Sequence, residues 1–379
     1  MSAVSLPSKP HYPILDGLRG VAALLVVAFH LCEAHAMQLG ERYHLDQVIN
    51  HGYLAVDFFF LLSGFVIGYA YDDRWGSMSF KNFFTRRLVR LHPLVIWGTL
   101  VGALLFYFQG SAIVWGGVDL NAVPLWKVIL TMLVGFTLIP LTPSMDIRGW
   151  AEMHPLNGPC WSLFFEYVAN ILYALFVRKL SNTVLAILVF VCGAALIHLT
   201  LTNPPGDVTG GWSFNLEQLH VGFVRMLYPF FAGLLLFRVA KLRRINNAFL
   251  WCSLGIVVLL AMPRFGGADH FWMNGLYEAL CIILFFPLIV YLGASGNAMS
   301  PVAAKVSKFF GDLSYPIYIT HYPIIYVYTA WAVNHKKTLS DSYLELSVAF
   351  ISILALGYLS LKLYDEPLRK WLGKRFLHG

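Results

Sequence analysis

Eleven apolar runs divide the 379-residue chain almost from end to end, and they limit its fold more than any other feature. A helix needs about 20 largely apolar residues to cross the hydrocarbon core of a bilayer. Only 12% of the residues are charged, whereas soluble domains average about 25%. The sequence therefore predicts an all-α, polytopic membrane protein. The runs lie near residues 14–36, 53–72, 88–108, 126–142, 162–178, 184–202, 218–238, 247–263, 274–293, 311–333 and 343–364.

No repeat, low-complexity tract or soluble-sized insertion interrupts these runs, so we expect one membrane-embedded domain over residues 1–379. The first run is not a cleavable signal peptide, because it is long, carries Arg19 and lacks a small-residue cleavage site. The net charge of +7 does not indicate nucleic-acid binding, because basic residues gather at the cytoplasmic ends of membrane helices. The five scattered cysteines match neither a disulfide framework nor a metal site, and we expect no metal.

Positive charge orients the runs. The basic segments 74–90, 238–244, 305–308 and 369–375 are expected inside the cell, with both termini, and this places 143–161 outside. Both termini inside require an even number of crossings. Only one of the runs 88–108 and 126–142 can then span, and the shorter one, flanked by Pro140 and Pro143, is expected to re-enter or lie in the interface. The prediction is about ten transmembrane helices plus that segment.

The first run carries Arg19 and His30, eleven residues apart. Eleven steps of about 100° make three turns plus about 20°, so both side chains lie on one face, separated by roughly 16 Å along the axis. Charged groups at membrane depth normally face a cavity or a partner. One face thus offers a cation near the cytoplasm and a base deeper in the bilayer. Two alternatives stay open: Arg19 as an interfacial topology signal and His30 as a hydrogen-bonded core histidine.

Three further stretches place polar groups within apolar runs. Residues 56–67 are apolar except for an aspartate at the start and Ser63-Gly64 within. Residues 83–93 stack Arg86, Arg87 and Arg90 at the cytoplasmic end of a predicted helix. Residues 160–173 open a helix at the outer face with Glu166 one turn inside it. The structural alternative for Glu166 is a favourable position near a helix N-terminus.

In these features the sequence resembles the acyltransferase family 3 membrane proteins, bacterial O-acyltransferases that modify glycans and other hydroxylated acceptors. The resemblance covers essentially the whole chain and implies a location in the bacterial cytoplasmic (inner) membrane. It implies an acyl-CoA donor, usually acetyl-CoA, and a hydroxyl acceptor. We expect no additional C-terminal esterase-like domain, because the chain ends soon after the last run. The motifs are Arg19-x10-His30, FFFLLSGFVI, Arg87-x-x-Arg90-x-x-Pro93, WSLFFE (161–166), SYPIYITHYP (314–323) and YDEPLRKW (364–371).

Transfer from a thioester to an alcohol requires a base, a bound thioester and stabilisation of an oxyanion. The family match and its depth favour His30 as the base, with Glu166 reaching a similar depth from the opposite side to orient the imidazole. Arg19, Arg87 and Arg90 are interpreted as the donor's phosphate site, since guanidinium groups bind phosphate oxygens in a bidentate manner. Their alternative is plain membrane topology, which we prefer for Arg86.

Four more residues are candidates for lining a substrate cavity: Ser63, Tyr315, Tyr318 and His321. Ser63 is also a candidate acyl-enzyme nucleophile, although helix packing through Ser63-Gly64 is the preferred interpretation. Tyr318 and His321 are three residues apart and share a helix face. Pro316 and Pro323 are expected to break the helix. Interfacial anchoring is the alternative for the tyrosines.

A secondary transporter or flippase for a lipid-linked or anionic substrate is the competing function, because such proteins also place charged residues around a central site. An inactive sensor or scaffold is a third option. Besides membrane lipid, the expected partner is a glycan, a lipid-linked sugar or another hydroxylated acceptor. The sequence specifies neither which of these it is, nor the acyl chain length, nor the oligomeric state.

Overall fold

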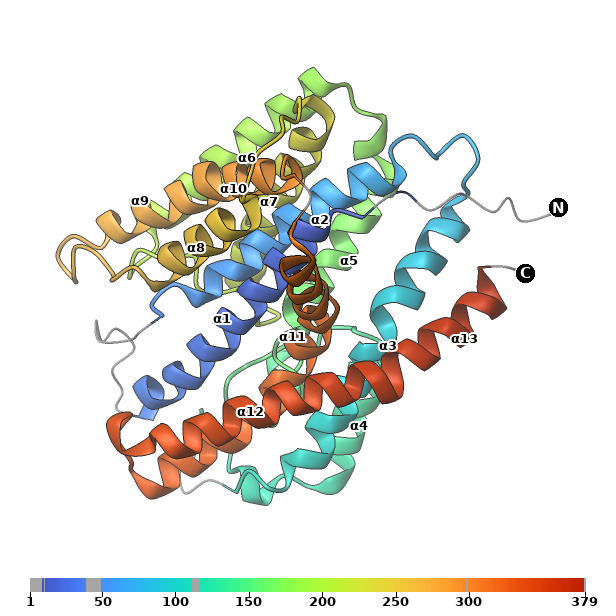
Figure 1. Cartoon of the computed structure of the whole chain (residues 1–379). Coiled ribbons are helices and arrows are strands. Elements are labelled where there is room, and N and C mark those ends of the chain that lie inside the picture. Colours follow the sequence, from blue (N-terminus) through green and yellow to red (C-terminus); the bar gives the residue numbers. More distant parts are fainter. Residues whose placement is uncertain (1–8, 10, 39–48, 111–115, 298, 378–379) are drawn as a thin grey trace.

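The computed structural model describes residues 9, 11–38, 49–110, 116–297 and 299–377, and over these residues it is built of helices without a named strand (Figure 1). The all-α fold class is confirmed. The helices are α1 (Pro13–Gln38), α2 (Ala55–Tyr71), α3 (Phe80–Phe106), α4 (Leu125–Gly135), α5 (Cys160–Leu175), α6 (Asn182–Thr202), α7 (Leu216–Val239), α8 (Ala248–Ala261), α9 (Trp272–Leu280), α10 (Phe286–Ala294), α11 (Pro301–His335), α12 (Tyr343–Leu359) and α13 (Glu366–Phe376). Short π-helical segments join α9 to α10 (Cys281–Phe285) and α12 to α13 (Ser360–Asp365).

Within the described residues, eight helical stretches are long and apolar enough to cross a membrane. The joined pairs α9–α10 and α12–α13 each count as one of them. The two other predicted spans correspond to α8, with 14 residues, and to α11, with 35. By contrast, α4 has 11 residues and is about 16 Å long, which is too short for a hydrocarbon core of about 30 Å. The run at 126–142 is thus the one that does not span, as expected.

α11 packs along the length of α1 and also contacts α3 and α12 (Figure 1). Pro316 and Pro323 lie inside it, but the helix is continuous, so the prediction that these prolines break it is wrong. A proline within a helix leaves the carbonyl four residues earlier without its usual donor. At Pro323 that carbonyl belongs to Ile319, and Asn157 Nδ2 donates to it at 3.0 Å. The tertiary hydrogen bond replaces the missing helical one.

α2 and α7 cross at close range because glycines lie at their contact. A Cβ added at Gly64 of α2 would come within 1.9 Å of the Phe230 carbonyl oxygen, and one at Gly233 of α7 within 2.0 Å of the Leu61 carbonyl oxygen. The same two helices share a buried ion pair, in which Arg225 Nη2 lies 2.7 Å from Asp57 Oδ2. Asp57 is the acidic residue at the start of the apolar run 56–67, and its role is to pair with α7.

Several segments predicted to lie inside the cell contact one another. Lys9 Nζ lies 2.7 Å from Asp73 Oδ1. Arg238, which ends α7, lies 2.6 Å from Asp72 Oδ2 through Nε, and its Nη2 donates to the Arg178 carbonyl oxygen at 3.3 Å. The N-terminal segment, the α2–α3 connection and the ends of α5 and α7 therefore meet on one face of the molecule. Their contacts agree with the predicted common side.

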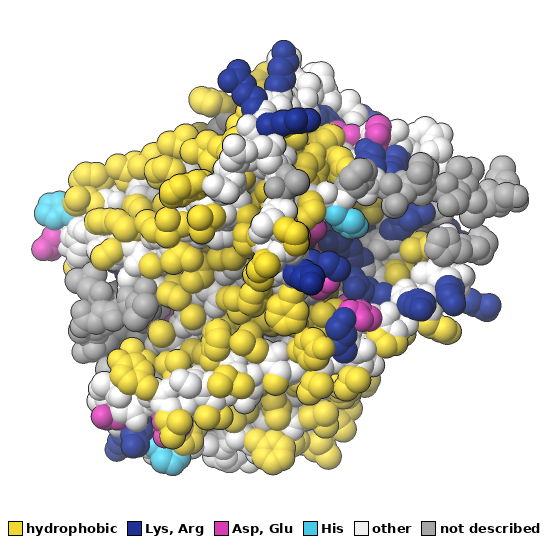
Figure 2. All heavy atoms as spheres, viewed as in Figure 1, with side chains coloured by type: hydrophobic (Ala, Val, Ile, Leu, Met, Phe, Trp, Pro, Cys, Tyr) yellow, Lys and Arg dark blue, Asp and Glu magenta, His cyan; other side chains and the backbone are white. Residues whose placement is uncertain are grey.

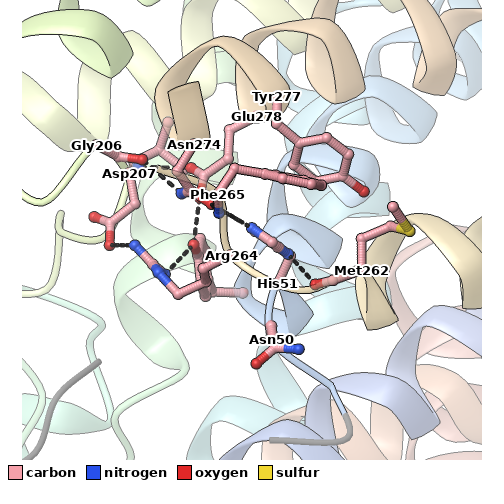
Figure 3. A network of polar contacts seen from close by, with 12 residues as sticks. Asn50, His51, Gly206, Asp207, Met262, Arg264, Phe265, Asn274, Tyr277 and Glu278 are labelled. Atoms are coloured by element: carbon pink, nitrogen blue, oxygen red, sulfur yellow. Dashed lines mark hydrogen bonds and ion pairs between the residues drawn. The ribbon is translucent and has the colours of Figure 1, made fainter. Parts of the chain in front are cut away.

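A second polar cluster lies where α8 and α9 approach the start of α2 (Figure 3). Arg264 Nη2 lies 2.7 Å from Asp207 Oδ2, and the His51 ring hydrogen-bonds Asn274. Asn274 in turn donates to Glu278 Oε1 at 3.0 Å. These side chains join the α6–α7 connection, the α8–α9 connection, α9 and the segment just before α2. Because these side chains hydrogen-bond and pair with one another, the cluster stabilises the packing of the segments that it joins.

Candidate active site

The site is built around a cavity of about 660 Å³ enclosed mainly by α1, α2, α3, α5 and α11. Binding sites for small molecules and cofactors commonly have volumes of about 300–1,000 Å³. Val56, Phe59, Phe60, Val66 and Leu163 supply much of its apolar wall. Charged side chains from α1, α3, α5, α11, α13 and the π-helical segment before α13 line the remainder. An apolar passage with a charged end suits a ligand that has a charged head and a less polar arm.

The charged residues of the cavity are mostly paired. Four cations each lie beside a carboxylate: Arg19 with Asp16 (3.1 Å), Arg87 with Glu166 (2.6 Å), Lys308 with Asp312 (2.7 Å) and Arg369 with Asp365 (3.0 Å). Arg90 is the exception, since it forms no ion pair or hydrogen bond within the part of the chain that the structure describes, and it is exposed to the cavity. Free positive charge is thus concentrated at Arg90.

Arg19, Arg87 and Arg90, the predicted phosphate site, all line this cavity. α1 contributes the first and α3 the other two. On α3, the spacing of three residues places Arg87 and Arg90 on the same side of the helix. Because two of the three guanidinium groups already have carboxylate partners, Arg90 has the greatest capacity to bind a new anion. The structure thus brings the three predicted arginines together and distinguishes Arg90 as the one without a carboxylate partner.

Ser63, Arg87 and Glu166 meet at the wall of the cavity. Ser63 Oγ donates to Glu166 Oε1 at 2.5 Å, and Arg87 Nη2 lies 2.6 Å from the same oxygen. Ser63 therefore faces the cavity, while the neighbouring Gly64 supports the packing against α7. The contact joins α2, α3 and α5. It holds Glu166 as a fixed negative group beside the passage.

The carboxylate bonded to His30 is Glu33 rather than the predicted Glu166. His30 Nδ1 and Glu33 Oε2 are 2.7 Å apart on α1. Glu166 is instead engaged by Ser63 and Arg87, because α5 packs against α2, α3 and α7. An ionised carboxylate only accepts, so in the neutral imidazole Nδ1 carries the hydrogen and Nε2 keeps its lone pair. This is the tautomer that a general base requires.

His30 lies just beyond the inner end of the cavity. Tyr318 lines that end, its ring centroid is 5.8 Å from that of His321, and the His321 ring stacks on His30 at 5.5 Å. The prediction that His321 lines the cavity is not supported, because its side chain is fully buried behind Tyr318. His30 is not part of the lining either, and its side chain is 19% exposed.

Tyr315 and Tyr318 line the cavity as predicted, and each has a fixed hydroxyl. Tyr315 donates to the Leu91 carbonyl oxygen at 2.6 Å, and the Tyr318 hydroxyl lies 2.7 Å from Ser162 Oγ. Tyr318 is buried and Tyr315 is partly buried, and both hydroxyls are hydrogen-bonded within the helix bundle, so interfacial anchoring does not describe them.

Sequence reasoning missed several members of the site. The contact of Glu33 with His30 could have been predicted from the sequence, because a histidine and a glutamate three residues apart on one helix are neighbours. Asp365 and Arg369 belong to the motif YDEPLRKW (364–371), for which no role in the site was predicted from the sequence. Their arrival at the cavity depends on the continuation of α12 into α13, which carries the chain back against α3. No local pattern could show that contact.

The comparisons with known proteins identify a family for the chain. A family model described as an acyltransferase domain (Acyl_transf_3) matches residues 12–362. Acyltransferase MdmB of Streptomyces mycarofaciens is 25% identical over 97% of this chain and 94% of its own length. O-acetyltransferase OatA of Staphylococcus aureus is 23% identical over 96% of this chain, which spans 58% of OatA. "Protein 2 in picA locus" of Rhizobium radiobacter is 33% identical over 42% of this chain and 80% of its own length.

No solved structure matches the chain. The match to the family extends from the start of α1 into the π-helical segment after α12, so it includes every site residue described above except Asp365 and Arg369. A family of acyltransferases favours an enzyme over the transporter or flippase that composition alone left open.

Proposed function

The chain belongs to acyltransferase family 3, and we propose that it is a membrane O-acyltransferase that moves an acyl group, in the first place acetyl, from acyl-CoA to a hydroxyl group. The observation that carries the proposal is the continuity of the cavity, from the cationic end at Arg90 to Tyr318, which adjoins the His321 and His30 rings.

The donor occupies the cavity in this proposal. Its anionic head lies at the end formed by Arg19 and Arg90, where guanidinium groups bind phosphate oxygens. The pantetheine arm follows the apolar wall. Along α11, Lys308 and Tyr318 are ten residues apart, or about 15 Å by helical rise. An extended arm covers such a distance, and the thioester then lies beside Tyr318, about one helical turn from His321.

The chemical step uses His30 as the base. Nε2 removes the proton of the acceptor hydroxyl while the oxygen attacks the thioester carbonyl. The carbon–sulfur bond of the tetrahedral intermediate then breaks, and the departing sulfur takes the proton from the imidazolium. The products are an ester and free CoA. Glu33 stabilises the imidazolium between the two proton transfers, as the carboxylate of a hydrolase triad does.

The acceptor approaches from the side of His30 that faces away from the donor cavity. Tyr322 packs edge-on against His30 with 4.9 Å between ring centroids, and Tyr326 follows at 4.8 Å from Tyr322. Trp150, from the segment predicted to lie outside, packs on Tyr326 at 5.5 Å. Aromatic faces of this kind stack on sugar rings. We therefore propose a glycan or lipid-linked sugar as the acceptor, with the protein in the cytoplasmic (inner) membrane and both termini cytoplasmic.

Mass spectrometry of envelope glycans and lipids tests this function. Cells that make the native protein should carry an additional acetyl mass on one class of acceptor, and cells that make only His30→Ala at equal abundance should lack it. Purified native protein should release CoA from acetyl-CoA when that acceptor is added. Uptake or translocation of a substrate without thioester consumption would contradict the proposal and support a transporter.

A further inference from the structure

A second hollow adjoins the cationic end of the cavity. Its volume is about 420 Å³, and it lies between the first turns of α3 and the C-terminal helix α13. Arg90 and Arg369 line both hollows, so the two share a wall. Figure 2 shows Lys and Arg side chains gathered on the right side of the molecule, where Figure 1 places α13 beside the start of α3. The rest of the lining is Tyr71, Arg86, Val89, Glu366, Lys370 and Leu377.

This outer hollow has an excess of uncompensated positive charge. Arg86, Arg90 and Lys370 form no ion pair within the described residues, and Arg86 Nε is buried without a hydrogen-bond partner. The hollow's carboxylate, Glu366, is held by Lys362 at 2.5 Å. The larger cavity differs, because four of its five Lys and Arg side chains are paired with carboxylates. An anion entering from the cytoplasmic side therefore finds its strongest uncompensated field in the outer hollow.

We propose that the outer hollow binds a phosphate monoester, namely the 3′-phosphate of the coenzyme. This inference rests on the proposed function and assigns a subsite for the donor. Coenzyme A carries two separate anionic groups, a pyrophosphate and a 3′-phosphate, joined through one ribose. Two adjoining hollows that share Arg90 and Arg369 match that arrangement, with the pyrophosphate on the inner side of these side chains and the monoester on the outer side.

The apolar members of the outer hollow fit the same ligand. Tyr71 and Leu377 offer ring and aliphatic surface beside the cations, and an adenine can pack on such surfaces. Arg86 and Lys370 come from different helices, so they can approach one phosphate from two directions. In this arrangement α13 is part of the donor site.

Anionic lipid headgroups share the chemistry of a phosphate ester, so the experiment separates the two sources. Binding of acetyl-CoA and of its 3′-dephospho analogue is measured on the purified full-length protein in nanodiscs of phosphatidylcholine alone and of phosphatidylcholine with phosphatidylglycerol. The native protein should bind acetyl-CoA at least about tenfold more tightly than the analogue, as expected for the loss of charge-assisted hydrogen bonds. That ratio should be the same in both membranes.

Two single variants and one control locate the effect. Lys370→Gln and Arg86→Gln should each weaken acetyl-CoA binding by about tenfold while leaving the affinity for the 3′-dephospho analogue unchanged. Lys370 is exposed, so its replacement leaves the folded protein intact. Lys374→Gln, on the same helix but outside both hollows, should behave as the native protein.

Results that contradict the proposal fall into three kinds, each with a different meaning. Equal affinity of the native protein for both ligands, or an equal loss for both in the variants, would overturn the subsite while leaving acyl-CoA as the donor. Stabilisation of the native protein, but not of Lys370→Gln, by phosphatidylglycerol without discrimination between the two ligands would make the hollow a lipid site. Failure of the native protein to bind either ligand would refute the proposed function itself.

Discussion

His30 and Glu33 lie one helical turn apart on α1, and their hydrogen bond leaves Nε2 of the imidazole free to accept a proton. Glu33 does not line the donor cavity, so its effect on the reaction passes through His30. This makes Glu33 a positioning residue. Its replacement should change the chemical step while leaving the binding of acyl-CoA as it is.

Glu33→Gln should lower kcat by about 10- to 100-fold, as losing the carboxylate that orients a functional histidine commonly does. His30→Ala should lower kcat further, by about 10²- to 10⁴-fold, because the base itself is absent. The KM for acetyl-CoA should stay within about twofold of the native value in both. CoA release by the purified variants measures these constants. Glu217→Gln, an exposed carboxylate on α7, is the matched control. Native kcat in Glu33→Gln would contradict the role of Glu33.

His154 is a buried histidine with neither ring nitrogen hydrogen-bonded within the described residues. Burial lowers its pKa to about 3, from an ordinary value near 6.5. The unfolded chain then binds a proton that the folded chain excludes as the pH falls below about 6.5. The contribution of this group to stability is therefore complete above about pH 6.5 and is lost progressively as the pH falls toward 3.

His154→Leu should remove this acid sensitivity, because leucine is of similar size and carries no titratable group. The difference in unfolding free energy between the variant and the native protein should grow by about 1.4 kcal/mol per pH unit below pH 6, in favour of the variant. Denaturant unfolding in detergent at pH 7, 6 and 5 measures it. Parallel pH profiles for the two proteins would show that His154 does not titrate in this way.

Among the helices, α2 and α7 form the contact with the clearest physical basis. Glycines on both helices let the backbones approach, and the Asp57–Arg225 pair, almost fully buried, joins them electrostatically. Arg225 also donates to two backbone carbonyls, those of Tyr53 and Gly210. Removing one partner of a buried ion pair leaves the other charge buried and unpaired, which strongly lowers the free energy of unfolding.

Arg225→Met should lower the free energy of unfolding by about 3–5 kcal/mol, because the Asp57 carboxylate remains buried and unpaired. The double variant Asp57→Leu with Arg225→Met should recover most of that loss, since an apolar pair of similar volume replaces the ions. Thermal unfolding in detergent compares the three proteins. A double variant less stable than Arg225→Met would contradict this explanation. It would show that the unpaired Asp57 carboxylate does not account for the stability lost in the single variant.

The sequence predicted where the helices lie better than whether one helical segment continues into the next. Hydrophobic run length located the spanning segments, because it depends on local composition. The even number of crossings required by the charges, with the shorter length of the run 126–142, identified the region of α4 as the one that does not span. The prediction failed at α11, where Asn157, 162 positions away in the chain, satisfies the carbonyl freed by Pro323. It also failed at α12 and α13, which a π-helical segment joins into one stretch with a polar end. Helix continuity at such points is decided by tertiary contacts.

The whole molecule places its basic segments on one face and the 143–161 segment elsewhere, and the proposed function requires these to be opposite sides of the membrane. Residues of α13 and of the N-terminal end of α1 line the donor cavity. Trp150 and Tyr326 belong to the other side of His30 in the proposal. Membrane sidedness is therefore a test of how donor and acceptor are kept apart.

Two exposed serines, one on each predicted side of the membrane, allow a matched labelling test of sidedness. Ser77 lies in the α2–α3 connection, and Ser144 lies in the segment before α5. In intact spheroplasts, a membrane-impermeant thiol reagent should label Ser144→Cys and spare Ser77→Cys, and both should react after lysis. The native protein, with its five cysteines, supplies the background. The reverse pattern would place the donor cavity outside the cell and would rule out a cytoplasmic donor.

The candidate site was predictable where one helix carries both partners. The Arg19 and His30 spacing and the Arg87 and Arg90 spacing both follow from helical periodicity. The three arginines line one cavity, and His30 lies just beyond its inner end. The choice of carboxylate for His30 was wrong because a contact between α1 and α5 cannot be read from periodicity. Arg369 and Lys370 were read only as a basic tail, because their approach to α3 depends on the path of the last helix.

The most direct test of the central claim is a determined structure of the protein with a non-hydrolysable acetyl-CoA analogue. The account predicts that the phosphates contact Arg90 and the α3–α13 end of the cavity, and that the acyl carbon lies beside Tyr318 on the side nearest His321 and His30. An analogue bound with its phosphates at the opposite side of the membrane, or with its acyl group remote from Tyr318, would contradict the account.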